Sequence, residues 1–260
     1  MSKMHVPKFN EILYKSMELY KANFRRLFLI GVLAAVFGEL LQTVSNNAGL
    51  QRIMLLIEKN GVNALQGQVS GKTLGIILFL GCLGGLIWLI AHALCVVILN
   101  ESWQGRYMPI NLALKNVWPC LMVLIATTII AKMLIGFGLI LYVIPGVIIS
   151  AFFFVYVPVI LFENLTIISA LKRSSALAKV YFWPTLWMSF FAFFFMVFPD
   201  LIGALVKGQG AVSNLGFGLD RMIIVFLSAL FLPFVAALIL TQYHVLKAVS
   251  HNQEKGLEEA

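Results

Sequence analysis

Three ionisable residues, Glu39, His92 and Lys132, stand inside apolar stretches and are the chain's strongest candidates for proton or ion chemistry. An ionised side chain at the bilayer centre costs a few kcal/mol, so it needs a partner, a cavity or access to the surface. Glu39 and Lys132 lie about 18–21 Å from the inner edge of their stretches, at 1.5 Å per residue. Their equal depth favours a structural ion pair. A polar pathway and separate snorkelling to the surface are the alternatives.

Other residue types that often carry chemistry show no matching spacing. We expect His92 to be a packing histidine, with a proton relay as the alternative. The cysteines show neither metal-type nor disulfide spacing. The chain has no glycine-rich phosphate loop and no Gly-x-Ser-x-Gly motif. We therefore expect a protein that is not an enzyme, with no cofactor and no metal site.

These residues are positioned by apolar helices. The chain is 61% hydrophobic and 12% charged, with a mean hydropathy of +0.94, whereas soluble domains carry about a quarter charged residues. Apolar runs of about 20 residues must be helices in lipid, because the backbone finds no water partners there. We expect an all-α membrane protein with one polytopic domain over 1–260 and six spans: 27–44, 74–99, 119–143, 147–162, 184–206 and 222–246.

Basic residues set the expected orientation. Of the nineteen lysines and arginines, thirteen lie in the N-terminus, the 100–118 and 163–183 loops and the C-terminus. Five lie on the opposite side, and Lys132 lies in a span. The side richer in lysine and arginine is usually cytoplasmic, so both termini are expected in the cytoplasm.

Two segments, 7–26 and 164–181, have an apolar and a basic face at helical spacing, and Ile110–Val117 is a shorter third case. Such helices lie in the membrane interface with the basic face toward head groups. We expect phospholipid rather than nucleic acid to be the partner of these charges. The head-group candidates are Lys21, Arg25, Arg26, Lys115, Lys172, Arg173 and Lys179.

A weak internal repeat accompanies these segments. The pair Trp118–Pro119 precedes the third span, and the pair Trp183–Pro184 precedes the fifth. Trp prefers the head-group level, and Pro suits the first turn of a helix. A unit of one amphipathic helix and two spans, repeated three times along the chain, would explain the pattern. The first unit lacks the Trp-Pro pair, so three-fold repetition stays a hypothesis.

Proline and glycine mark two breaks in the middle of the chain. Pro145 and Gly146 are expected to form a tight outer turn between the third and fourth spans. Pro158 is expected to kink the fourth span. A fixed kink that shapes the bundle is the main interpretation, and a gating hinge is the alternative.

The same region carries a family resemblance. The stretches GLILYVIPG (138–146), PVILFE (158–163) and ALKRSSAL (170–177) resemble the YciC family of bacterial inner-membrane proteins. They are also similar to the membrane domain fused to some glycerophosphodiester phosphodiesterases. The resemblance implies a multi-pass protein of the bacterial inner membrane and assigns no reaction. The chain has no soluble region of the roughly 250 residues that the phosphodiesterase barrel needs.

The leading hypothesis is a non-enzymatic inner-membrane protein that engages phospholipid, in envelope organisation or lipid movement. The first alternative is a small transporter or channel with a polar path near Glu39, Lys132 and His92. The second is a structural or assembly partner of another membrane complex. A protein partner or a homo-oligomer is left open.

Overall fold

A computed structural model of the chain describes residues 7–49, 53, 55–58, 70–207 and 219–258. These residues form helices and no strand, and six helical segments are long and apolar enough to cross a membrane. The protein is an all-α, multi-pass membrane protein, as its composition predicts. The helices are α1 (Phe9–Asn47), α3 (Gly71–Trp103), α4 (Ile110–Val117), the 3-10 turn η2 (Trp118–Cys120), α5 (Leu121–Leu141), α6 (Val143–Phe152), α7 (Tyr156–Glu163), α8 (Ile167–Val180), α9 (Phe182–Lys207) and α10 (Leu219–Glu258).

The longest helices extend well beyond a bilayer. Helices α1 and α10 have 39 and 40 residues, about 58–60 Å at 1.5 Å per residue, against a hydrocarbon core of about 30 Å. Each contains a predicted span and continues past it. We call the end of the molecule that holds Pro7, Trp103, Tyr107 and Tyr181 the inner end, and the opposite end the outer end.

The packed core lies toward the inner end. Every residue of α3 from Ala91 to Asn100 is buried, and so is every residue of α10 from Leu232 to Tyr243. Helix α1 packs along α10 and α3, and α9 also packs along α10. Helices that are apolar all round must be enclosed by neighbours or lipid, and here the neighbours enclose the inner halves.

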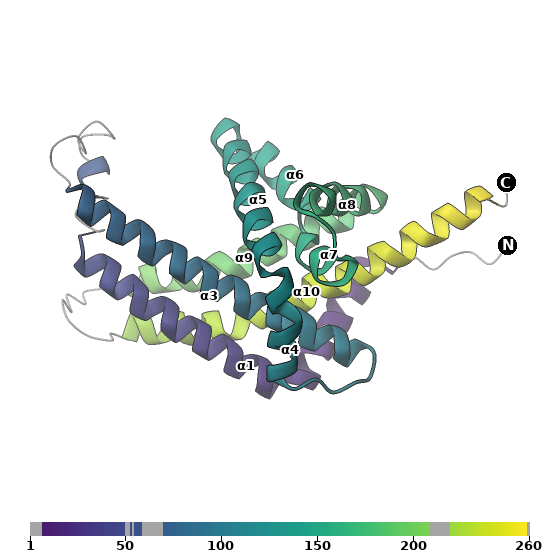
Figure 1. Cartoon of the computed structure of the whole chain (residues 1–260), viewed down its shortest axis with the longest axis horizontal. Coiled ribbons are helices and arrows are strands. Elements are labelled where there is room, and N and C mark those ends of the chain that lie inside the picture. Colours follow the sequence, from purple (N-terminus) through teal and green to yellow (C-terminus); the bar gives the residue numbers. More distant parts are fainter. Residues whose placement is uncertain (1–6, 50–52, 54, 59–69, 208–218, 259–260) are drawn as a thin grey trace.

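The outer halves are apolar and exposed. In Figure 1, α1 and α3 extend side by side in one direction, while α5 and α6 rise as a separate hairpin. Among the residues that the structure describes, none covers their outward side chains, so this surface faces lipid. Exposed apolar residues here include Leu33 and Phe37 of α1, Leu78 and Phe79 of α3, and Met133, Phe137 and Ile140 of α5.

The turn between the third and fourth spans comes earlier than predicted. Helix α5 ends at Leu141, and α6 starts at Val143, so extended Tyr142 alone makes the turn. Pro145 and Gly146 lie in the first turn of α6, where Pro costs no helical hydrogen bond. Gly146 instead lets the two helices approach, because a Cβ on Gly146 would lie 2.8 Å from the Leu139 backbone nitrogen.

The fourth span is interrupted, as the position of Pro158 predicts. Helix α6 ends at Phe152, and α7 begins at Tyr156, with Phe153–Val155 between them. Pro158 is buried in the first turn of α7. The break therefore precedes the proline by one turn, which spares its ring a clash with a helical carbonyl. Whether this break acts as a hinge stays a prediction.

The amphipathic segment 7–26 differs from its prediction as a separate interfacial helix. It continues without a break into the first span as α1. Its apolar face, including Ile12 and Tyr20, is buried by protein rather than by lipid. The sequence has no Pro or Gly near residue 26 to end the helix, so nothing local separates the two parts.

The other two amphipathic segments form short helices of their own. Helix α8 covers most of 164–181 and packs its apolar face on α5, α6, α7 and α10. Helix α4 precedes Trp118–Pro119, as α8 precedes Trp183–Pro184. The order of short helix, Trp-Pro pair and long helix thus occurs twice. Continuous α1 departs from it, and the three-fold repeat stays a hypothesis.

Candidate functional site

The basic segments gather at the inner end through specific contacts. The Arg26 guanidinium lies 3.7 Å from the centroid of the Tyr107 ring. Asn23 donates to Ser102 Oγ at 2.7 Å. The Tyr181 hydroxyl donates to the Pro7 carbonyl at 3.2 Å. The loops that the charge pattern assigns to one side of the membrane therefore meet at one end of the molecule.

Five of the seven predicted head-group residues are exposed and two are engaged with protein. Arg26 is half-buried on Tyr107, and Arg173 pairs with Glu163, with its Nε 3.1 Å from Oε2. The exposed residues can reach head groups without losing a protein partner that the structure records. They are Lys21, Arg25, Lys115, Lys172 and Lys179.

Arg173 belongs to a polar cluster that links three helices. Glu163, at the end of α7, pairs through one carboxylate oxygen with Arg173 of α8. Its other oxygen accepts a hydrogen bond from the Tyr243 hydroxyl of α10, at 3.0 Å. The Lys247 ammonium lies 3.4 Å from the same hydroxyl. A carboxylate with two donors is well satisfied, so Arg173 links α8 to α7 here, and its contact with lipid head groups stays a prediction.

Aromatic rings stand beside the exposed lysines. Trp118 and Trp183 are 68% and 69% exposed, although each follows a helix packed on the core. Lys115 precedes Trp118 by three residues and Lys179 precedes Trp183 by four. Exposed Trp next to Lys is typical of the head-group level of a membrane. We call Lys115, Trp118, Lys179 and Trp183 the basic-aromatic surface.

The predicted pair of Glu39 and Lys132 does not form. Lys132 is exposed on α5, whereas Glu39 is half-buried on α1, and α5 does not pack against α1. Arg221, in the first turn of α10, is the cation that acts on Glu39, and Asp200 and Asp220 are its acidic neighbours. Equal depth predicted the wrong partner, because two charges at one depth can stand on helices that never touch.

Glu39 lines a small cavity between α1, α3, α9 and α10. The cavity measures about 130 Å³, and its lining includes Trp88, Asp200 and Ser228. Arg221 donates to the Thr43 hydroxyl one turn above Glu39. Lys132 and His92 are not among the residues that line it. The three residues of the predicted polar path therefore do not converge at this cavity.

His92 is packed inside the core, as expected. It is 3% exposed and stacks on Trp88, with ring centroids 5.6 Å apart. Its Nδ1 has no hydrogen-bond partner among the described residues. Three polar pairs join helices of the spans: Thr128 with Tyr156, Ser150 with Ser189, and Gln242 Nε2 with Thr185. Thr127 Oγ1 and Gln242 Oε1, like His92 Nδ1, are buried with no partner among the described residues.

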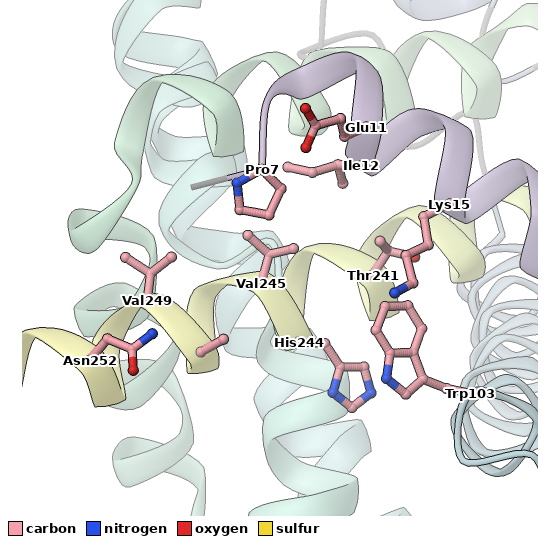
Figure 2. A pocket seen from close by; sticks show the side chains of 11 residues that line it. Pro7, Glu11, Ile12, Lys15, Trp103, Thr241, His244, Val245, Val249 and Asn252 are labelled. Atoms are coloured by element: carbon pink, nitrogen blue, oxygen red, sulfur yellow. The ribbon is translucent and has the colours of Figure 1, made fainter. Parts of the chain in front are cut away.

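A larger cavity opens at the inner end, where α1, α3 and α10 meet (Figure 2). It measures about 360 Å³. Its exposed mouth carries Glu11, Lys15 and Ala248, and Thr241 is fully buried in its wall. We call it the inner cavity; its lining is Pro7, Glu11, Ile12, Lys15, Trp103, Thr241, His244, Val245, Ala248, Val249 and Asn252.

Aromatic stacking organises one wall of the inner cavity. The His244 ring lies flat on the Trp103 indole, with centroids 4.7 Å apart and an angle of 10°. Lys15 Nζ lies 4.1 Å from the Trp103 ring centroid. His244 Nε2 lies 3.0 Å from Asn100 Oδ1. The sequence alone does not reveal this site, because its residues come from three distant segments and share no local motif.

Comparisons of the chain with family models, with curated proteins and with solved structures found no match. The geometry of the sites themselves therefore guides the functional interpretation.

Proposed function

We propose that this protein is a non-enzymatic protein of the bacterial inner membrane that engages phospholipid at its cytoplasmic face, in envelope organisation or lipid movement. The observation that carries the proposal is the basic-aromatic surface. Lys115 and Lys179 are exposed beside exposed Trp118 and Trp183, at equivalent places before two spans. Tryptophan at the head-group level fixes the depth at which the lysines meet anionic lipid.

The rest of the inner end supports the same proposal. Lys21, Arg25 and Lys172 are also exposed there, and the exposed apolar outer halves place lipid around the spans. Each basic residue near an anionic surface contributes about 1 kcal/mol. Several together favour anionic over zwitterionic lipid without any catalytic group.

Lipid retention tests the proposal. Native mass spectrometry of the purified protein should find phosphatidylglycerol retained over phosphatidylcholine when both are offered at equal concentration. The triple variant Lys115→Gln, Lys172→Gln, Lys179→Gln should lose most of this preference, by roughly a hundredfold in affinity if the three contributions add.

Lys72→Gln is the matched control, because Lys72 is equally exposed but lies at the outer end, at the start of α3. It should keep the preference. A triple variant that retains phosphatidylglycerol as the unchanged protein does would contradict the proposal.

The cavity at Glu39 favours a second candidate, a small transporter for protons or cations. A half-buried carboxylate beside a cavity, with Asp200 in the lining, could hold a cation. Cation or proton flux into liposomes that Glu39→Gln abolishes would favour transport over lipid engagement.

A further inference from the structure

The inner cavity has the construction of a binding site rather than of a packing defect. Its volume of about 360 Å³ lies within the range of ligand pockets, and most of its lining is apolar, with a few polar groups added. Three helices from distant parts of the chain contribute to it, so its shape depends on the whole fold. The basic-aromatic surface is not part of its lining.

Thr241 supplies an unused polar group in the wall of this cavity. Its side chain is fully buried, and its hydroxyl has no hydrogen-bond partner among the described residues. Buried hydroxyls are nearly always paired, because leaving one unpaired costs free energy. A polar ligand atom in the cavity would supply the missing partner.

Lys15 supplies a cation whose position is fixed. Figure 2 shows its side chain reaching toward the Trp103 indole beside Thr241. The ammonium is held over the ring, and the ring is held by His244, which in turn bonds Asn100. A positioned ammonium loses little freedom when it binds an anion. Glu11 is the acidic residue of the lining; it lies at the exposed mouth and takes part in an interaction of its own.

The depth of the cavity in the membrane indicates which class of anion it binds. Trp103 follows the predicted span 74–99 by four residues, and Thr241 and His244 lie in the last two turns of the predicted span 222–246. The cavity therefore lies at the level where head groups meet water. Lysine binds phosphate as a point charge, and hydroxyl and amide groups such as those of Thr241 and Asn252 can donate to phosphate oxygens.

We propose that the inner cavity binds the phosphate-bearing head group of an anionic phospholipid. Lys15 and Thr241 hold the phosphate, and Ile12, Val245 and Val249 cover the adjoining glycerol carbons. This inference rests on the proposed function and names one lipid-binding site for it. A soluble phosphate ester shares the same chemistry, so the test must separate the two sources.

Trp103 provides the signal for the test. The full chain in a neutral maltoside detergent is titrated with dihexanoyl phosphatidylglycerol, and tryptophan emission is followed. An anion bound to the Lys15 ammonium changes the charge beside the Trp103 indole. The part of the emission change that is lost in Trp103→Phe should therefore be saturable, while any part from Trp118 and Trp183 remains. Lys15→Met should weaken binding about tenfold, because it removes the charge-assisted contact. Lys15→Arg should restore most of it.

Lys72→Met is the matched control, because Lys72 is exposed but lies at the outer end and does not line the cavity. The affinity of this variant for dihexanoyl phosphatidylglycerol should equal that of the unchanged protein. Thr241→Val, which keeps the side-chain volume, should weaken binding a few-fold. A thermal melt of each variant establishes that it is folded, and the Lys15 variants carry the test if Thr241→Val does not fold.

Further titrations use sn-glycerol 3-phosphate and inorganic phosphate. Tighter binding of the short-chain lipid than of either soluble anion supports a lipid site. Equal affinity for sn-glycerol 3-phosphate would overturn the lipid source. Unchanged lipid affinity in Lys15→Met would overturn the site itself. Neither result touches the broader proposal, because the triple variant of the basic-aromatic surface and Lys172 leaves the inner cavity intact.

Discussion

At the scale of single residues, the partner of a charge in a span comes from a helix that packs against its own helix. A charge at the same depth on a distant helix does not act as a partner. Helix α1 packs along α10, so Glu39 meets the field of Arg221. Lys132 lies on the α5–α6 hairpin, where its long side chain is exposed and can snorkel toward the surface. The cost of a charge in the membrane is therefore offset by a neighbouring cation at Glu39 and by access to the surface at Lys132.

A double-mutant cycle tests this pairing. Glu39→Gln and Arg221→Met should each destabilise the protein, and their combined effect should differ from the sum by about 0.5–3 kcal/mol, as for interacting charges. Glu39→Gln and Lys132→Met should add within about 0.5 kcal/mol, because their helices do not pack together. Chemical unfolding of the purified protein in detergent measures each free energy. Strong coupling between Glu39 and Lys132 would contradict the arrangement of α1 and α5 described above.

At the scale of helices, much of the architecture follows from the sequence. Six apolar runs predicted six spanning segments, because lipid leaves the backbone no other way to pair its polar groups. The break before Pro158 follows from the geometry of its ring. Packing decides the rest. The turn at Tyr142 depends on contacts that no local pattern encodes, whereas the continuity of residues 7–26 with the first span agrees with the absence of a helix breaker between them.

The inner cavity was beyond sequence analysis for the same reason. Lys15, Trp103 and His244 are ordinary in their own segments, and only the packing of α1, α3 and α10 brings them together. The basic-aromatic surface was predicted in part, because Trp118 and Trp183 each stand in a local pattern next to lysine. Local patterns can predict a surface, whereas a cavity needs the tertiary fold.

The packing of α1 on α10 gives a second prediction. A Cβ on Gly31 would clash with the Ala229 carbonyl oxygen, whereas a Cβ on Gly38, two turns along the same helix, would meet nothing within 4 Å. Gly31→Ala should therefore destabilise the protein by about 1–3 kcal/mol, because the two helices must separate. Gly38→Ala should be neutral or stabilising by up to about 1 kcal/mol, since Ala is the better helix former.

Thermal unfolding of both variants in the same detergent compares them directly. A Gly31→Ala variant as stable as Gly38→Ala would show that α1 and α10 do not approach each other at Gly31 as closely as the structure has them.

At the scale of the whole molecule, packing and charge are both asymmetric. The core lies toward the inner end, while the outer halves of the helices leave their apolar side chains to lipid. The exposed basic residues of α4 and α8 also lie toward the inner end. Since the protein spans the membrane several times, this asymmetry fixes how it is expected to sit: inner end in the cytoplasm, outer end away from it.

Cysteine labelling tests this orientation. Single cysteines replace Arg106, Lys172 or Lys72, all of which are exposed, in a background without Cys82, Cys95 and Cys120. A membrane-impermeant maleimide added to intact cells with a permeabilised outer membrane should label position 72 alone. Positions 106 and 172 should react only after the membrane that the protein spans is opened, if the positive-inside bias sets the orientation as proposed. Labelling of position 172 in intact cells would invert the orientation, and with it the leaflet whose lipids the basic-aromatic surface and the inner cavity could reach.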